Sequence, residues 1–146
     1  KNRQVFVVLE DSPVKKKSDL KGKKLGLQAA SSAADALNNN PDFKKELAEV
    51  VELDYYSTAL MDLEKGGVDA VLMDEVVADY YIQVRGEGYR ILDESLATEE
   101  YGIGFRKNDK KLMEKIQETL EAMAKDGTVA QISEKWFGKD LTTIGK

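Results

Sequence analysis

Residues 63–81 read LEKGGVDAVLMDEVVADYY, and this stretch decides the expected fold. Two glycines end a helical segment, and the run VDAVLM at residues 68–73 is apolar, as is typical of a buried strand. Asp74 follows that strand directly. After it, apolar residues recur at the spacing of a helix face: Val77, Tyr80, Tyr81 and Val84. The stretch therefore predicts a helix, a buried strand and a second helix, with Asp74 at the junction of the strand and the second helix.

The same alternation extends outward along the chain in both directions. Strands are expected at residues 4–9, 24–28, 50–54, 68–73, 89–92 and 101–105, with helices between most of them and two more at residues 109–125 and 128–136. Alternating strands and helices indicate a parallel sheet covered on both faces. The predicted fold class is α/β: a three-layer sandwich with a mostly parallel central sheet, helices on both faces, and C-terminal helices.

The composition excludes several classes of function. The chain has 146 residues, no cysteine, no histidine and a formal net charge of -5. Without His or Cys, the usual zinc, haem, iron–sulfur and thiol sites and any Ser-His-Asp triad are ruled out, so we predict no metal and no cofactor. The acidic balance argues against nucleic acid as a partner, because phosphate binding depends on clustered Lys and Arg. Carboxylate, hydroxyl and backbone groups remain for binding.

Two strand ends carry the candidate site. In an open α/β sheet the ligand crevice lies beyond the carboxyl ends of the strands. Small and hydroxyl residues, Ala29 to Ser32, follow the strand at 24–28, where free N–H groups at a helix start suit a carboxylate. Asp74 follows the strand at 68–73 and could accept hydrogen bonds from an ammonium group. Together they match the two charges of an amino acid zwitterion, although each residue could instead simply cap its own helix.

Five segments, in order, resemble the polar amino acid solute-binding proteins of ABC importers, also called type 2 periplasmic binding proteins. The segments are SDLKGKKLGLQ at 18–28, the small residues at 29–32, LEKGGVDAVLMDEVVADYY at 63–81, EEYGIGFRKND at 99–109 and DGTVAQISEKWFG at 126–138. The resemblance implies that Ser31 and Ser32 bind the ligand's α-carboxylate, that Asp74 binds its α-ammonium, and that Gln28 lies near its side chain. Ala30 stands in the same run, where the family usually has glycine.

The resemblance also implies a two-lobe receptor of which this chain is a fragment. Residues 1–106 would form the second lobe, with hinge strands at about 4–9 and 101–106, and residues 107–146 would be C-terminal helices that normally pack on a missing first lobe. The receptor would be extracytoplasmic, either periplasmic or extracellular, and a lipoprotein of the cell surface in a Gram-positive organism. It would bind a polar amino acid between its lobes and present it to an ABC transporter permease.

In the fragment, one apolar helix stripe loses its usual cover. The stripe consists of Leu112, Ile116, Leu120 and Met123. An exposed patch of this kind promotes association, which makes a homodimer through this face one expectation.

Three other interpretations stay open from the sequence. A dehydratase built on the same scaffold would use Asp74 or a nearby glutamate as an acid, and it would need a carboxylate with a strongly raised pKa. A ligand-sensing domain would carry the same lobe fused to a signalling module. A flavodoxin-like domain unrelated to binding would require all five resemblances to be coincidence.

Overall fold

The computed structural model describes residues 1–86 and 88–145, and these residues form two compact units. Glu87 and Lys146, the last residue of the predicted C-terminal segment, lie outside the described residues. The first unit, Asn2–Glu99, is called the sheet unit. The second, Glu100–Lys146 together with Lys1, is called the helical unit. Each is described by itself.

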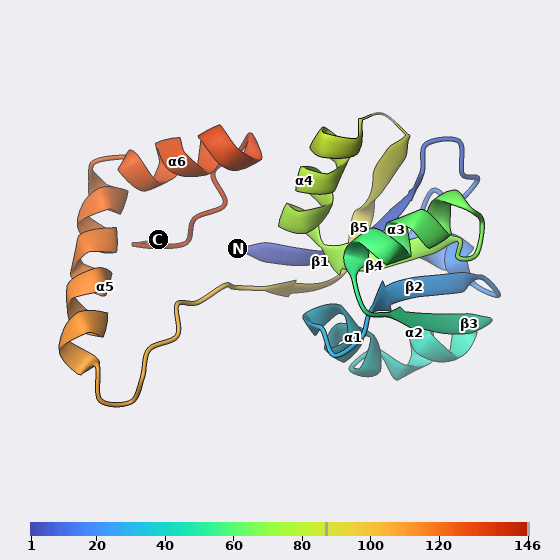
Figure 1. The fold of residues 1–146 in the computed structure, drawn as a ribbon, viewed down its shortest axis with the longest axis horizontal. Coiled ribbons are helices and arrows are strands. Elements are labelled where there is room, and N and C mark those ends of the chain that lie inside the picture. Colours follow the sequence, from blue (N-terminus) through green and yellow to red (C-terminus); the bar gives the residue numbers. More distant parts are fainter. Residues whose placement is uncertain (87, 146) are drawn as a thin grey trace. The chain divides into compact units, whose positions relative to one another are not determined.

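In the described part of the sheet unit, five strands form one sheet in the order β3-β2-β4-β1-β5 (Figure 1). β2 runs parallel to both β3 and β4, whereas β1 runs antiparallel to both β4 and β5. Only β1 therefore opposes the common strand direction, and the predicted α/β class is confirmed. The strand bounds are β1 Asn2–Leu9, β2 Lys24–Gln28, β3 Glu49–Leu53, β4 Ala70–Asp74 and β5 Tyr89–Glu99.

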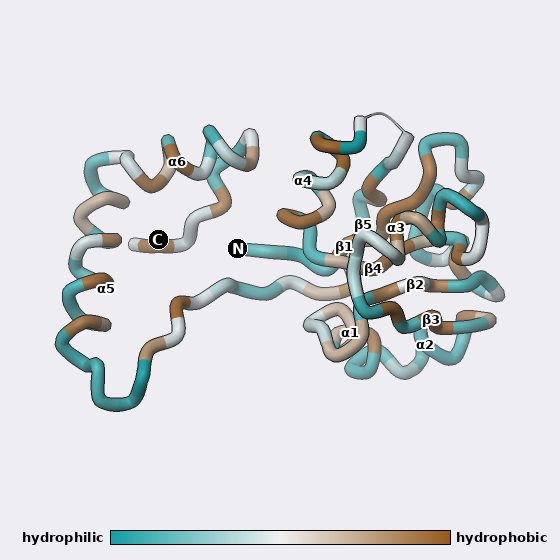
Figure 2. The backbone as a smooth tube through the Cα atoms, in the orientation of Figure 1, coloured by the Kyte–Doolittle hydropathy of each residue, from teal (hydrophilic) through white to brown (hydrophobic). Residues whose placement is uncertain are grey.

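Helices cover both faces of this sheet, because the strands bury side chains on alternating sides. On one face, Phe6, Leu27 and Leu72 pack with Leu37 of α1 (Ser32–Asn38). Phe43 of α2 (Pro41–Glu46) packs against this cluster. The short 3-10 turn η1 (Lys17–Leu20) adds Leu20 to it. On the other face, Val5 and Met73 pack with Leu60 of α3 (Tyr56–Glu64) and Ala78 of α4 (Glu75–Arg85). The hydrophobic colouring follows these strands in Figure 2.

The strand predicted at residues 101–105 is wrong, and β5 is longer than predicted. β5 continues through Glu99, and residues 101–106 have no regular secondary structure. The described pairing of β1 with β5 ends at the pair Asn2 and Glu99. Gly102 and Gly104 also disfavour a strand there.

The helical unit consists of α5 (Lys110–Lys125) and α6 (Thr128–Phe137), which contact each other. Gly127, with φ 85°, turns the chain between them, a conformation that glycine adopts without strain. Both helices confirm the sequence prediction to within one residue at each end. On α5, Leu112 is 53% exposed, while Ile116 and Leu120 line a groove of about 320 Å³ within this unit.

Candidate functional site

Asp74 ends β4 at the carboxyl edge of the parallel strands, and three side chains hold its carboxylate. Asn2 Nδ2 and Gln4 Nε2 donate to Oδ1 at 2.7 and 2.9 Å, and the Tyr56 hydroxyl donates to Oδ2 at 3.2 Å. The residue is 8% exposed. Its side chain makes no capping hydrogen bond to α4. The alternative in which Asp74 only caps its helix is therefore wrong. The carboxylate is held by side chains from β1 and α3.

Strand register explains why these groups meet. Gln4 lies opposite Asp74 in the β1–β4 pair, and Asn2 lies opposite Glu99 in the β1–β5 pair. Asn2 and Gln4 are two residues apart, so both amides project from one face of β1. Each amide also donates to Glu99 Oε1, at 2.6 and 2.9 Å respectively. Asn2, Gln4, Asp74 and Glu99 are called the amide–carboxylate cluster below.

Of the two predicted serines, Ser32 hydrogen-bonds to this cluster directly, whereas Ser31 contacts Tyr56, the hydroxyl that donates to Asp74. Gln4 Nε2 donates to Ser32 Oγ at 3.0 Å, which connects the start of α1 with the Asp74 carboxylate through a single amide group. Ser31 Oγ instead accepts from Ala34 N at 3.3 Å, as the N-cap of α1, and donates to the Gln28 carbonyl at 2.6 Å. The capping alternative is therefore confirmed for Ser31.

Gln28 and Ala30 lie at the same edge but make no hydrogen bond to the cluster. Gln28 Nε2 donates to the Asp54 carbonyl at 2.9 Å, between the ends of β2 and β3. Ala30 is exposed, and it is the non-glycine residue with positive φ (51°) among the residues described. A left-handed conformation costs an L-residue roughly 1–2 kcal/mol, a cost that glycine avoids. The backbone conformation gives a physical reason for a glycine preference at this position.

Tyr56 is the hydroxyl donor to Asp74, and its surroundings keep it protonated. Burial, followed by the negative charge of Asp74, raises the pKa of Tyr56 to about 12. Both effects disfavour the phenolate. The phenol therefore stays a hydrogen-bond donor over the whole neutral range and fixes the second oxygen of the Asp74 carboxylate.

This arrangement predicts an alkaline loss of stability that depends on Tyr56. Because the folded-state pKa (about 12) lies above the usual value of 10.0, the stabilisation is present below pH 10 and is lost as the pH rises toward 12. Urea unfolding at about pH 9, 10 and 11 measures this loss. Between the lowest and the highest of these pH values, the free energy of unfolding should fall more for the parent chain than for Tyr56→Phe. Tyr55→Phe, at the exposed neighbouring tyrosine, should behave like the parent. Equal pH dependence of the parent and Tyr56→Phe would contradict the assignment.

Four residues of the site were missed by the sequence interpretation: Asn2, Gln4, Tyr56 and Glu99. A signal for two of them was present. In NRQVFVVL, Asn2 and Gln4 fall on the same alternate positions as the core residues Phe6 and Val8. Amides on a buried strand face need partners, which marks them as members of a polar network. Tyr56 and Glu99 carry no comparable signal, since their contacts depend on pairing between distant segments.

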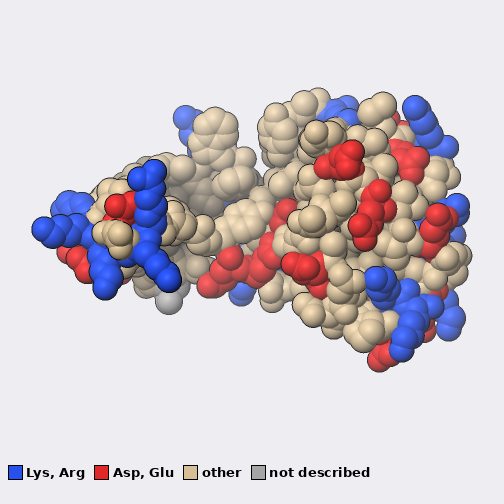
Figure 3. Space-filling view, turned by 60° about the horizontal axis from the view of Figure 1, so that its bottom comes forward, with Lys and Arg blue, Asp and Glu red and all other residues tan. Residues whose placement is uncertain are grey.

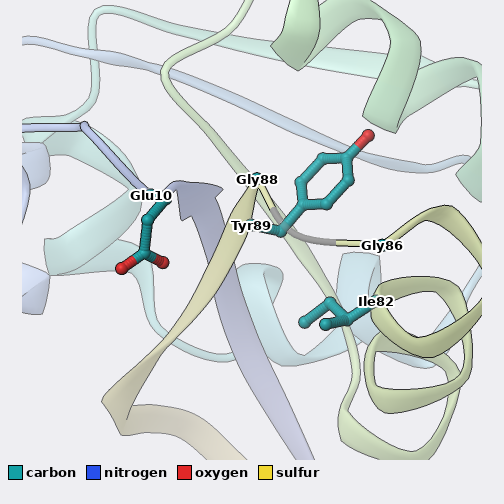
Figure 4. Close-up of a pocket in the computed structure, with 5 residues that line it drawn as sticks. All are labelled: Glu10, Ile82, Gly86, Gly88 and Tyr89. Carbon is teal, nitrogen blue, oxygen red and sulfur yellow. The ribbon is translucent and has the colours of Figure 1, made fainter.

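A separate cavity of about 480 Å³ lies at the other end of β1, beyond Leu9. It is lined by Glu10, Ile82, Gly86, Gly88 and Tyr89 (Figure 4). The Glu10 and Tyr89 side chains point away from each other in this view, so these two polar groups among the described lining residues do not converge on one ligand position. The amide–carboxylate cluster is therefore the better candidate site.

Three further observations concern the visible surface, the acidic side chains and the length of the helices. On the face of the sheet unit seen in Figure 3, acidic and basic side chains are interspersed and form no extended basic surface. Within residues 1–86 and 88–145, no group of three or more Asp or Glu side chains is placed to hold a metal ion. In the same ranges, no helix is both long and apolar enough to cross a membrane.

Comparison with known proteins identifies relatives of one kind. The family model for bacterial extracellular solute-binding proteins, family 3, matches residues 1–139. The L-cystine-binding protein TcyJ of Escherichia coli K12 is 30% identical over 132 residues, which cover 90% of this chain and 48% of TcyJ. The chain thus spans about half the length of the curated relatives it matches.

Two solved structures share the fold. An ABC uptake transporter substrate-binding protein from Streptococcus pneumoniae, with bound histidine, has a TM-score of 0.84 and 35% identity; the match covers 97% of this chain and 60% of that one. An ancestral arginine-binding protein bound to arginine has a TM-score of 0.76 and 38% identity over 94% of this chain and 61% of that one.

These matches settle the class of protein. The relatives are solute-binding proteins and not enzymes, and several are named as binding proteins of amino acid ABC transporters. The dehydratase alternative is therefore not favoured. The resemblance read from the five segments is confirmed by a family match over almost the whole chain. This chain belongs to family 3 of the bacterial extracellular solute-binding proteins.

Proposed function

We propose that this chain holds a polar amino acid by both of its backbone charges, with Asp74 as the acceptor for the α-ammonium. The observation that carries the proposal is the Asp74 carboxylate itself. It lies at the carboxyl edge of the sheet, held by Asn2, Gln4 and Tyr56, and one shared amide connects it to Ser32. A carboxylate fixed in this way is prepared for a cationic group, because its orientation is set before the ligand arrives.

The α-carboxylate would bind at the small-residue turn before α1. The exposed Ser32 hydroxyl and the backbone at Ala30 and Ser31 supply the donors, and Gln28 lies on the neighbouring strand end, where it would meet the ligand's side chain. The relatives favour an amino acid ligand: one is named for L-cystine, and two solved neighbours hold histidine and arginine. Which amino acid this chain prefers depends on contacts to the rest of the side chain.

We further propose that the chain is the second lobe of a two-lobe receptor, followed by the C-terminal helices of residues 107–146. The shared length supports this, since the matches cover about half of each curated relative. In the complete receptor a first lobe would close over Asp74 and Ser32, and the closed form would be recognised by an ABC transporter permease. A lipid anchor at the cell surface would apply in a Gram-positive organism.

Calorimetric titration with L-histidine, L-arginine, L-cystine and L-glutamine tests this function. The 146-residue chain alone should bind weakly or undetectably, because half of the contacts in a two-lobe clamp are absent. The full-length product of the gene that encodes it should bind at least one of these amino acids. A micromolar Kd for the chain alone would show that no first lobe is needed. Failure of the full-length product to bind any polar amino acid would overturn the function.

The α5 face defined by Leu112, Ile116, Leu120 and Met123 supports a second proposal about the chain by itself. Leu112 is exposed and the other three are half-buried. Two copies could cover this face by packing it against itself. Sedimentation velocity on the 146-residue chain would then give a dimer that Leu112→Glu dissociates, and a monomer at all concentrations would contradict the proposal.

A further inference from the structure

The two amides of the amide–carboxylate cluster face more acceptors than they have N–H hydrogens. The amides of Asn2 and Gln4 carry two N–H hydrogens each. Asn2 Nδ2 uses both, on Asp74 Oδ1 and Glu99 Oε1. Gln4 Nε2 faces three acceptors with two hydrogens: Ser32 Oγ, Asp74 Oδ1 and Glu99 Oε1. All amide hydrogens are thereby engaged, and none is left for a further acceptor.

Two acceptors of the cluster remain without a donor in the described structure. Gln4 is fully buried, and its Oε1 has no hydrogen-bond partner. Glu99 is half-buried, and among the described residues its only hydrogen bonds come from the two amides to Oε1, which leaves Oε2 without one. A buried acceptor without a donor costs free energy, and a partly buried carboxylate without a cation costs more. Gln4 Oε1 and Glu99 Oε2 are therefore the acceptors of the cluster without a donor among the described residues.

The basic residue between the two amides in the sequence, Arg3, does not supply a cation to Glu99. Arg3 lies between Asn2 and Gln4, but its side chain projects from the other face of β1. There its guanidinium binds Glu75 with two hydrogen bonds, both 2.8 Å, in a paired arrangement. No ion pair joins a lysine or arginine to Glu99 within the described ranges. The charge of Glu99 is met by neutral amides alone.

We propose that Glu99 is a second acceptor for the ligand's ammonium group, beside Asp74. An ammonium brings three N–H donors and one positive charge, and Glu99 has neither a donor at Oε2 nor a cation among the described residues. Since Asn2 Nδ2 bonds to one oxygen of each carboxylate, Asp74 and Glu99 lie close enough to share one cation. The inference rests on the proposed amino acid function and extends it: recognition of the ammonium would depend on two carboxylates, one from β4 and one from the end of β5.

A purely structural role for Glu99 makes a different prediction. If Glu99 served only to orient the two amides, its loss would weaken binding of every ligand alike. If it contacts the ammonium, its loss would weaken only ligands that carry one. Des-amino analogues separate the two cases, because they keep the carboxylate and the side chain and lack the α-ammonium. The matched pairs are L-histidine with imidazolepropionate, and L-arginine with guanidinovalerate.

The experiment compares three variants of the full-length gene product by calorimetric titration with these pairs. Glu99→Gln should weaken binding of the amino acid by about tenfold or more, as expected for a lost hydrogen bond to a charged group, and leave the des-amino analogue unchanged. Glu100→Gln makes the same change at the exposed next residue and should match the parent. Asp74→Asn tests the underlying function. It should weaken binding of the amino acid and not binding of the des-amino analogue.

Each outcome has one meaning. The two-carboxylate site is supported if Asp74→Asn and Glu99→Gln each weaken binding of the amino acid but not of its des-amino analogue. If only Asp74→Asn weakens binding of the amino acid selectively, the role of Glu99 is overturned and the proposed function stands. The same holds if Glu99→Gln weakens binding of the amino acid and of its des-amino analogue equally. If neither variant weakens the amino acid, the proposed function fails as well.

Discussion

Replacement of Asp74 by asparagine should weaken amino acid binding to the full-length gene product by about a hundredfold or more. Asn keeps the size of the side chain but removes the negative charge that an ammonium group pairs with. Removing one partner of a desolvated, hydrogen-bonded charge pair costs about 2–5 kcal/mol, and each 1.4 kcal/mol corresponds to about tenfold in Kd. Titration of the parent and Asp74→Asn with the tightest-binding amino acid measures this ratio directly.

A matched variant tests whether the effect on Kd comes from the charge of Asp74 itself or from any negative charge at this edge of the sheet. Asp54 follows β3 at the same edge, and it is exposed. Asp54→Asn therefore makes the same chemical change without touching the cluster and should leave the Kd within about twofold of the parent. Unfolding curves for both variants check that each is folded. If folded Asp74→Asn binds within about threefold of the parent, Asp74 does not hold the ammonium.

Local pattern was sufficient to find Asp74 and Ser32, and not sufficient to find their partners. An apolar strand followed by a helix predicts where a strand end lies, and in a parallel sheet such ends meet at one edge. Asn2 and Gln4 join the site only because β1 inserts between β4 and β5. That pairing joins residues about seventy positions apart, which no window of the sequence reports.

The end of β5 shows the same limit of prediction from local sequence. The segment 101–105 was predicted as a strand from its own residues, yet the described pairing of β5 with β1 ends at Glu99. The same boundary places Glu99 beside the amides, so the residue that ends the strand is also the one that joins the site. Strand ends are set by both strands of a pair, and a single segment predicts only one of them.

Gln4→Leu should destabilise the 146-residue chain by about 2 kcal/mol and also weaken amino acid binding to the full-length gene product. Leucine fits a side chain that is fully buried next to Phe6 and the β4 core, so the loss is mainly of hydrogen bonds. Asp74 and Glu99 each lose one amide donor, and hydrogen bonds to charged groups contribute about 1.5–3 kcal/mol. Relief of the unpartnered Gln4 Oε1 offsets part of this. Urea unfolding of the chain at neutral pH measures the stability change.

Two comparisons assign that loss to the carboxylates. Gln28→Leu removes a glutamine whose amide donates only to a backbone carbonyl, and it should cost less than about 1 kcal/mol. In the Asp74→Asn background, one of the charges that Gln4 solvates is already gone, so Gln4→Leu should cost about 1 kcal/mol less than in the parent. An equal cost in both backgrounds would mean that Gln4 stabilises the fold by packing, and that the site does not depend on it to hold Asp74.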